Sequence, residues 1–190
     1  MPMEMVPDFG SVTANRLFAQ LGYAACAVCA DIKPAVLFHV RGEANLTAWG
    51  HHGKAFINIL GLHVHCLAGD RQNMALIFYR PGHLCEVLER SDSRAFLRGI
   101  GYPDGETHKG DLARLSRRYR SGSYPHEIGV FLGYPPHDVM GYIENNGQHW
   151  LACRYWKVYD DLEGAIDLFS RIDHCKKAAA AQLLQCVCPS

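Results

Sequence analysis

The sequence has 190 residues, the length of one ordinary domain. Hydrophobic residues make up 48% and charged residues 20%, a globular mixture that excludes a disordered or fibrous chain. Lysine and arginine together number 19, as do aspartate and glutamate, so the formal net charge is +0. We therefore expect no overall attraction to nucleic acid or to an anionic membrane.

The beginning of the sequence lacks the pattern of a secretory signal. Glu4 and Asp8 precede the first basic residue, Arg16, and no apolar run follows a basic start. The longest uncharged stretches, 17–30 and 55–69, are shorter than the ~20 residues that a membrane-spanning helix needs. We therefore expect a cytoplasmic protein without a membrane segment, in which the eight cysteines are reduced thiols.

The first sixty residues predict two helices around a short strand. Apolar residues recur at steps of three or four over 11–30, where Ser11 or Thr13 could cap a helix. Residues 35–40, with the sequence AVLFHV, are typical of a buried strand. A second helix is expected over 44–60.

The clearest local signal is a β-hairpin over 62–79. Residues 62–67 and 74–79 are apolar and rich in strand formers, and the polar segment 69–73 separates them. Residues 150–159 alternate enough to predict another strand of the same sheet.

The rest of the chain is expected to be helical. Residues 81–147 predict several helices with breaks at glycine and proline, and 162–186 predict a long final helix. We expect one domain over 1–182, followed by a loose tail over 183–190. The predicted fold class is α+β, a small and mainly antiparallel sheet covered by several helices.

Three stretches of the sequence carry a family resemblance. Residues 125–135 have the sequence PHEIGVFLGYP, and Cys26 is followed by IKPAVLF at 32–38. The stretch that begins at 125 continues through Asp138, Val139, Gly141, Ile143 and Gly147. The third stretch is YWKVY at 155–159. Together they resemble an uncharacterised domain-of-unknown-function family common in anaerobic bacteria. The resemblance spans roughly residues 15–176 by the placement of these motifs, and it implies no established activity.

Two departures from the family pattern bear on the cysteines. Members usually carry histidine before the motif cysteine, where this chain has Ala25, and threonine where it has Cys29. The spacing Cys26-x-x-Cys29 is therefore not a device of the family. It also ends a predicted helix, whereas in thioredoxin-like proteins the motif opens one, so redox catalysis is not expected.

The segment Pro125-His126-Glu127 is the main candidate for a functional site. Proline suits the first position of a helix, which would place His126 and Glu127 in its first turn. Unpaired amides there would stabilise a carboxylate but give no reason for the imidazole. We therefore expect His126 and Glu127 to bind a small ligand or a partner protein at a concave site. Lys33, Arg80 or Cys26 is expected at the same site, with Lys33 and Arg80 as further ligand-binding groups.

A cysteine-dependent hydrolase or transferase is the alternative. Cys26 would be the nucleophile and His126 its base, with Glu127 orienting the imidazole. Cys26, however, falls inside an apolar helical pattern and not at a helix start, where the dipole would favour a thiolate. A third interpretation is structural: Cys26 packs in the core, while His126 and Glu127 cap a helix.

Other binding chemistry has weaker support in the sequence. His63 and His65 would face one side of a strand and could approach one metal ion, but Cys66 would face the other side. No four-ligand pattern accompanies them, so a structural zinc site is not expected. Haem or another iron cofactor stays open, because one histidine or cysteine suffices as an axial ligand. The basic run RLSRRYR at 114–120 is interpreted as a solvated helix face, and nucleic-acid binding is not expected.

Overall fold

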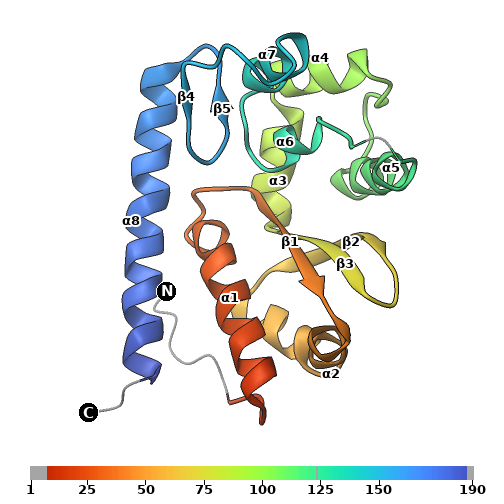
Figure 1. Cartoon of the computed structure of the whole chain (residues 1–190). Coiled ribbons are helices and arrows are strands. Elements are labelled where there is room, and N and C mark those ends of the chain that lie inside the picture. The colour runs from red at the N-terminus through yellow and green to blue at the C-terminus, as the bar shows by residue number, and fades with distance from the viewer. Residues whose placement is uncertain (1–7, 123, 188–190) are drawn as a thin grey trace.

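The computed structural model describes residues 8–122 and 124–187, which form eight helices and five strands (Figure 1). Its larger sheet has three antiparallel strands in the order β1-β3-β2. Their bounds are β1 (Ala35–Arg41), β2 (His63–Gly69) and β3 (Asn73–Tyr79). The predicted α+β class and the hairpin over 62–79 are both confirmed.

The turn of the hairpin is formed by the polar segment that the sequence indicates. Asp70 Oδ1 accepts hydrogen bonds from the backbone amides of Gln72 and Asn73, at 2.7 and 2.8 Å. Such side-chain bonds to the following amides favour a tight turn at aspartate. The register pairs His63 with Tyr79 and shifts at a bulge between Cys66 and Ala68.

Helices α1 (Val12–Cys29) and α2 (Glu43–Leu60) cover one face of this sheet. Ser11 caps the start of α1, as predicted: its hydroxyl accepts a hydrogen bond from the amide of Ala14 at 3.1 Å. Side chains of both helices form one apolar cluster with Val40, Leu76 and Phe78 of the sheet.

The opposite face of the sheet packs against helices from the middle of the chain, in a cluster that includes Ile77 and Tyr79. The alternation of side chains along each strand thus divides the sheet between two apolar clusters. Of these helices, α5 (His108–Arg120) packs directly on β2. The others extend the layer away from the sheet: α3 (Pro81–Glu89), α4 (Ser91–Gly99), α6 (Ile128–Phe131) and α7 (Pro136–Glu144). These five helices confirm the helical prediction for 81–147.

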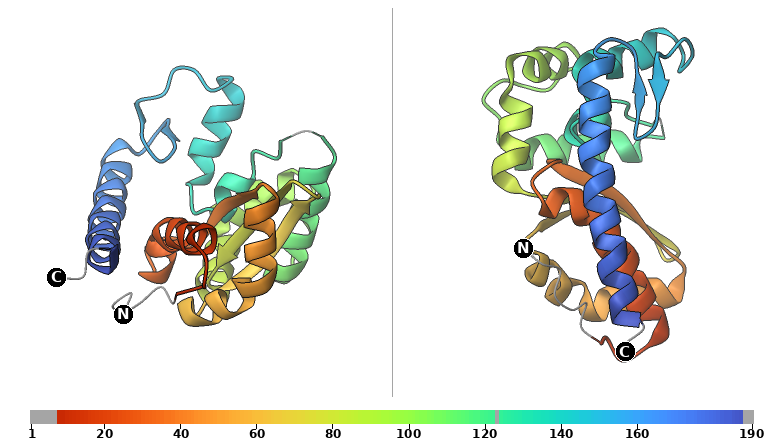
Figure 2. Two further views of the ribbon diagram at one scale, coloured as in Figure 1. Left: turned by 60° about the horizontal axis from the view of Figure 1, so that its bottom comes forward. Right: turned by 90° about the vertical axis from the view of Figure 1, so that its left-hand side faces the viewer.

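A third apolar cluster lies outside the sheet, where α8 (Leu162–Val187) packs against a small β-hairpin and α1. The hairpin consists of β4 (Ala152–Cys153) and β5 (Lys157–Val158), paired antiparallel. In Figure 2, α8 extends along the molecule from this hairpin to the first turns of α1. Within the described residues, no helix has the length and apolar character that crossing a membrane requires.

The prediction of one strand over 150–159 is wrong. The chain reverses direction at Arg154, whose amide donates to the carbonyl oxygen of Trp156 at 3.2 Å, and β4 and β5 pair only with each other. They form a separate sheet because they lie against α7 and α8, away from the edges of the larger sheet.

The end of the chain also differs from expectation. Helix α8 continues to Val187, five residues beyond the expected domain boundary at 182. Most of the segment 183–190 that was expected to be a loose tail is therefore helical, and 188–190 lie outside the described residues.

Candidate functional site

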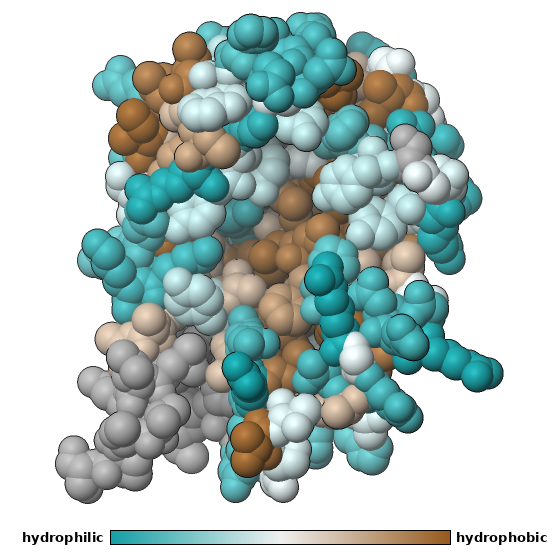
Figure 3. All heavy atoms as spheres, viewed as in Figure 1, coloured by the Kyte–Doolittle hydropathy of each residue, from teal (hydrophilic) through white to brown (hydrophobic). Residues whose placement is uncertain are grey.

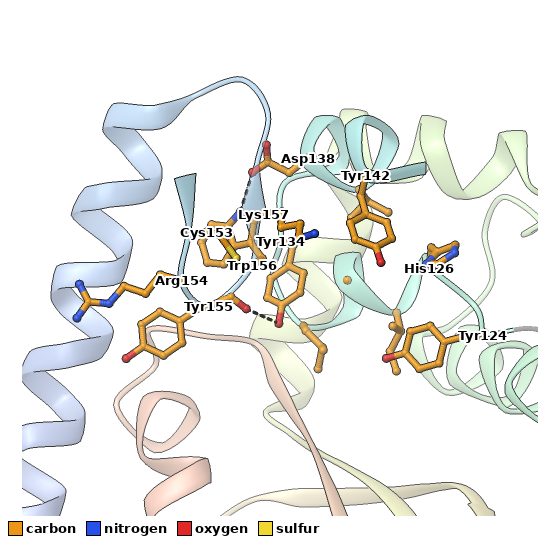
Figure 4. A pocket seen from close by; sticks show the side chains of 14 residues that line it. Tyr124, His126, Tyr134, Asp138, Tyr142, Cys153, Arg154, Tyr155, Trp156 and Lys157 are labelled. Atoms are coloured by element: carbon orange, nitrogen blue, oxygen red, sulfur yellow. Dashed lines mark hydrogen bonds between the residues drawn. The ribbon is translucent and has the colours of Figure 1, made fainter. Parts of the chain in front are cut away.

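A cavity of about 330 Å³ lies between α6, α7 and the β4–β5 hairpin. Figure 3 shows apolar side chains in a hollow at the centre of this face of the molecule, surrounded by more polar ones. Six ring-bearing side chains line the cavity: Tyr124, His126, Tyr134, Tyr142, Tyr155 and Trp156. We call this cavity the aromatic pocket; Figure 4 shows its residues from close by.

Asp138, in the first turn of α7, holds one wall of the aromatic pocket in place. Its carboxylate is buried and accepts two hydrogen bonds of 2.7 Å, from the indole Nε1 of Trp156 and from the amide of Tyr159. The short β4–β5 hairpin is thereby fixed to α7. A buried carboxylate with both oxygens engaged is a structural group, and it is not free to act as an acid or base.

The indole that Asp138 orients forms part of an aromatic stack. Trp156 lies parallel to Tyr134, with ring centroids 5.0 Å apart, and meets Phe169 of α8 edge-on at 4.4 Å. The phenol of Tyr134 donates to the carbonyl oxygen of Tyr155 at 3.3 Å (Figure 4). Burial raises the pKa of Tyr134 to about 12, so this phenol is neutral at physiological pH.

The opposite wall of the aromatic pocket contains His126. Its exposed imidazole lies between two phenol rings, with centroid distances of 6.0 Å to Tyr124 and 5.2 Å to Tyr142. Both tyrosines are partly exposed. His126 therefore lies at a concave, solvent-accessible site. Lys33, Arg80 or Cys26 was expected at the same site, but none of them is among the described residues that line this cavity.

Close packing explains why glycine occurs at several motif positions. A Cβ on Gly129 would lie 2.8 Å from Val139 and 3.0 Å from Tyr134. A Cβ on Gly133, whose φ is +82°, would lie 2.6 Å from Pro34. These glycines allow α6 to approach α7 and the loop that precedes β1.

Glu127 points away from the aromatic pocket into a buried ion pair. Its carboxylate accepts hydrogen bonds from Arg118 of α5 and from the phenol of Tyr102, which lies 3.2 Å away. Burial, followed by the charge of Glu127, raises the pKa of Tyr102. Only 3% of Glu127 is exposed, and both partners are protein groups, so the contacts support a structural role.

The expected helix start at Pro125 is wrong by three residues. Helix α6 begins at Ile128, and His126 and Glu127 occupy the turn before it. The helix has a single turn, and Arg118 and Tyr102, not the amides of that turn, stabilise the carboxylate of Glu127.

Comparison with known proteins adds a family and no activity. A family model described as "Protein of unknown function (DUF3793)" matches residues 21–189. The chain belongs to this family. The match includes every residue that lines the aromatic pocket, and it confirms the resemblance to a domain of unknown function that the motifs indicate. No curated protein and no solved structure matches the chain.

Of the two basic residues expected at the site, Arg80 is bound to backbone carbonyls, whereas Lys33 lies beside the aromatic pocket. Arg80 donates through Nε to the carbonyl oxygen of Val28 at 2.9 Å and through Nη2 to that of Cys29 at 2.7 Å. It therefore satisfies carbonyl groups at the end of α1, where a helix leaves them unpaired. Lys33 is half-buried, and its Nζ lies 5.1 Å from the centroid of the Tyr134 ring, beside the aromatic pocket.

Cys26 is buried in α1, and it is not among the described residues that line either of the two cavities bordered by His126. Burial and the neighbouring Cys175 of α8 raise the pKa of the Cys26 thiol to about 12. A thiol with such a pKa is protonated at neutral pH and is a poor nucleophile. The geometry therefore lends no support to the cysteine-dependent enzyme.

The histidines proposed for metal binding have other surroundings. The Nε2 of His65 lies 2.7 Å from the hydroxyl of Ser116, and the ring of His63 lies 5.7 Å from that of Tyr79. Within the part of the chain that the structure describes, no group of three or more histidine, cysteine or acidic side chains could hold a metal ion.

Sequence reasoning missed most of the tyrosines of the aromatic pocket. Tyr134 follows Tyr124 by ten residues and Tyr142 follows Tyr134 by eight, so the three tyrosines do not share one helix or strand period. The available signal was composition, because aromatic residues concentrate between 119 and 159. Tyr155 and Trp156 fall within the segment 150–159 that was predicted to be one strand, and both line the cavity.

Proposed function

We propose that the protein binds a small planar aromatic ligand in the aromatic pocket, with His126 at its rim. The observation that carries this proposal is the convergence of ring-bearing side chains on one open cavity: Tyr124, His126, Tyr134, Tyr142 and Trp156. Tyr155 also lines the cavity, but its ring points toward α8, where its hydroxyl donates to Asp173. Ligand pockets are mostly apolar clefts with a few oriented polar groups, and this cavity has that composition.

Stacking is the interaction that the free surfaces of the pocket favour. The one carboxylate among the described residues that line the pocket, Asp138, is engaged by the hairpin, and Glu127 points away to Arg118. The remaining faces are phenol and imidazole rings, which interact with planar ligands by offset stacking or edge-on contact.

Charge favours a neutral or anionic ligand over a cationic one. Lys157 Nζ lies 5.7 Å from the ring of Tyr142 and donates to the carbonyl oxygen of Gly147, so it brings a positive charge to the pocket. Aromatic cages that bind ammonium ligands rely on unopposed ring faces. Here an ammonium group would meet like charge, so the cavity does not suit a cation.

A titration with 1-naphthol, followed by two-dimensional ¹H–¹⁵N NMR, tests the proposal. We expect saturable shifts in the indole signal of Trp156 and in the amides of Gly129 and Gly133. The indole signal of Trp49, which lies in the apolar cluster of α1 and α2, should not move. Shifts confined to other parts of the protein, or no saturable shifts, would overturn the proposal.

Substitution of Tyr142 separates stacking from general apolar binding. Tyr142→Leu should weaken 1-naphthol binding about 2- to 10-fold, the value of one aromatic contact. Tyr142→Phe, which keeps the ring, should bind within about twofold of the wild type, because only a hydroxyl is lost. Equal binding by the leucine and phenylalanine variants would contradict stacking on this residue.

A further inference from the structure

Two lysines lie along the wall of the aromatic pocket that Tyr134 and Tyr155 form. Lys33, in the loop between α1 and β1, has its Nζ 5.1 Å from the ring centroid of Tyr134. Lys176 of α8 has its Nζ 4.6 Å from the ring centroid of Tyr155. Lys176 Nζ also lies 5.4 Å from the ring centroid of Tyr23 of α1. Neither lysine is among the described residues that line the pocket, but each contacts a residue that does, and the Tyr134 phenol joins these two residues by its bond to the Tyr155 carbonyl.

The loop that carries Lys33 is fixed against the pocket. Pro34 packs on Gly133, where any Cβ would lie 2.6 Å away, and the amide of Lys33 donates to the carbonyl oxygen of Ala27. The position of the ammonium group thus follows from close backbone packing and not from an unconstrained surface loop.

Among the described residues, no carboxylate lies within ion-pair distance of either ammonium group. Asp173 of α8, which also contacts Tyr155, is occupied: it accepts from the phenol of Tyr155 at 2.7 Å and pairs with Arg154 at 2.6 Å. Arg80, bonded to the carbonyls at the end of α1, adds another positive charge to this region.

The pKa of the Lys33 ammonium group is lowered by its burial and by the nearby positive charge. Burial, followed by the charge of Lys176, lowers its pKa from the ordinary value of 10.5 to about 8. An anion beside the two lysines would offset both effects, because it would supply the opposite charge that the protein does not.

We propose that Lys33 and Lys176 bind an anionic group, a phosphate or a carboxylate, carried by the ligand of the aromatic pocket. The inference rests on the proposed function and narrows it to planar aromatic compounds with an acidic substituent. Tyr134 and Tyr155 hold the ring system against the wall, and the two ammonium groups bind the charged end.

A matched pair of probes tests the inference: 1-naphthol and 1-naphthyl phosphate, which differ only in the phosphate, measured by calorimetric titration at low salt. We expect the phosphate ester to bind at least about fivefold more tightly than 1-naphthol, and the advantage to shrink in 0.5 M NaCl. The affinity of the ester should also fall between pH 7 and pH 9, as Lys33 loses its proton.

Substitutions of the two lysines test whether the phosphate of the ester binds to them. Lys33→Met/Lys176→Met should remove the advantage of the phosphate ester and leave 1-naphthol binding within about twofold, since the ring contacts remain. Lys33→Arg should keep the advantage, because it keeps the charge. Lys54→Met, an exposed lysine on α2, is the control for a general change in net charge.

The outcomes distinguish the inference from the function on which it rests. If both probes bind equally, or if the double variant keeps the advantage, the anion site is wrong while the aromatic pocket stands. If the ester binds through the lysines but 1-naphthol does not bind, the anion site stands and the stacking function is wrong. If neither probe binds, both proposals are overturned.

Discussion

The two β-sheets of this protein are both antiparallel, yet different forces hold them. The larger sheet pairs seven residues of β1 with seven of β3, and its two faces lie under separate apolar clusters. The β4–β5 hairpin has only two residue pairs. Because an isolated short hairpin is marginal in water, β4 and β5 depend on side chains of other elements.

That dependence centres on α7. Asp138 bonds the indole of Trp156 and the amide of Tyr159, and Gly141 allows Tyr159 to pack directly on the helix. The backbone ladder therefore fixes the sheet that supports the fold, whereas a few side chains fix the sheet that forms the aromatic pocket. Single substitutions should have the larger effect on the second.

The largest effect is expected from Asp138→Ala. The substitution leaves two buried donors without an acceptor, and each such loss costs about 1–3 kcal/mol. We expect the free energy of unfolding to fall by about 3 kcal/mol, measured by urea denaturation followed by tryptophan fluorescence. Asp167→Ala, an exposed position on α8, should remain within about 0.5 kcal/mol of the wild type. Equal stabilities of the two variants would show that Asp138 does not hold the hairpin.

A pair of glycine substitutions compares the same two regions. In Gly141→Ala the new Cβ would lie 2.6 Å from the Cβ and Cγ of Tyr159, atoms close to the backbone that cannot move away easily. We expect a loss of about 1–3 kcal/mol in unfolding free energy from this overpacking. Gly50 is an exposed position of α2, and a Cβ there meets nothing within 4 Å. We therefore expect Gly50→Ala to raise the unfolding free energy by up to about 1 kcal/mol through helix propensity. Thermal denaturation of both variants measures the difference, and changes of the same sign would contradict this interpretation.

The same contrast explains which parts of the fold could be predicted from the sequence. The apolar runs over 35–40 and 74–79, the polar turn at Asp70 and the cap at Ser11 are local signals, and the structure confirms the elements they indicate. The reversal at Arg154 has no glycine, proline or asparagine to mark it. It is stabilised by Asp138, sixteen residues earlier, and periodicity does not encode such a contact.

The candidate site shows the same limit. The motif at 125–135 predicts a concave surface at His126, and His126 does line a cavity, but the Lys33, Arg80 or Cys26 expected beside it is not among the described residues of that lining. The partner of Glu127 is Arg118, which the sequence assigns to a solvated basic helix face. Only the three-dimensional path of the chain brings these charges together, so the ion pair could not be inferred from spacing. The role of Lys33 in ligand binding stays a prediction.

The larger sheet has a polar feature of its own beneath α5. Since the Ser116 hydroxyl donates to the carbonyl oxygen of Leu112 at 3.0 Å, it accepts the hydrogen bond from the Nε2 of His65. The Nε2 of His39 lies 3.1 Å from the hydroxyl of Tyr119. Two strands of the sheet are thus joined to α5 through imidazoles.

These imidazoles should make the contact of α5 with the sheet sensitive to acid. Burial lowers the pKa of both His39 and His65, and the nearby Arg41 and Arg120 lower it further. Burial and Lys109 likewise lower the pKa of His108 at the start of α5. Because the unfolded chain takes up protons at these residues near pH 6.5, before the folded protein does, stability is complete above that pH and decreases below it.

The smallest effect we predict is therefore a change in the pH dependence of unfolding. In wild-type protein the urea midpoint should fall as the pH decreases from 7 to 5, partly because the imidazoles under α5 become protonated. The variant His39→Gln/His65→Gln cannot take up these protons, so its midpoint should fall less over the same interval. His51→Gln, at an exposed position of α2, should keep the wild-type slope. Parallel curves for all three proteins would mean that the acid sensitivity arises elsewhere. A flatter curve for the double variant alone would place it between α5 and the sheet. The backbone ladder would then fix this region of the fold, while the charge state of two side chains would set how firmly α5 packs on it.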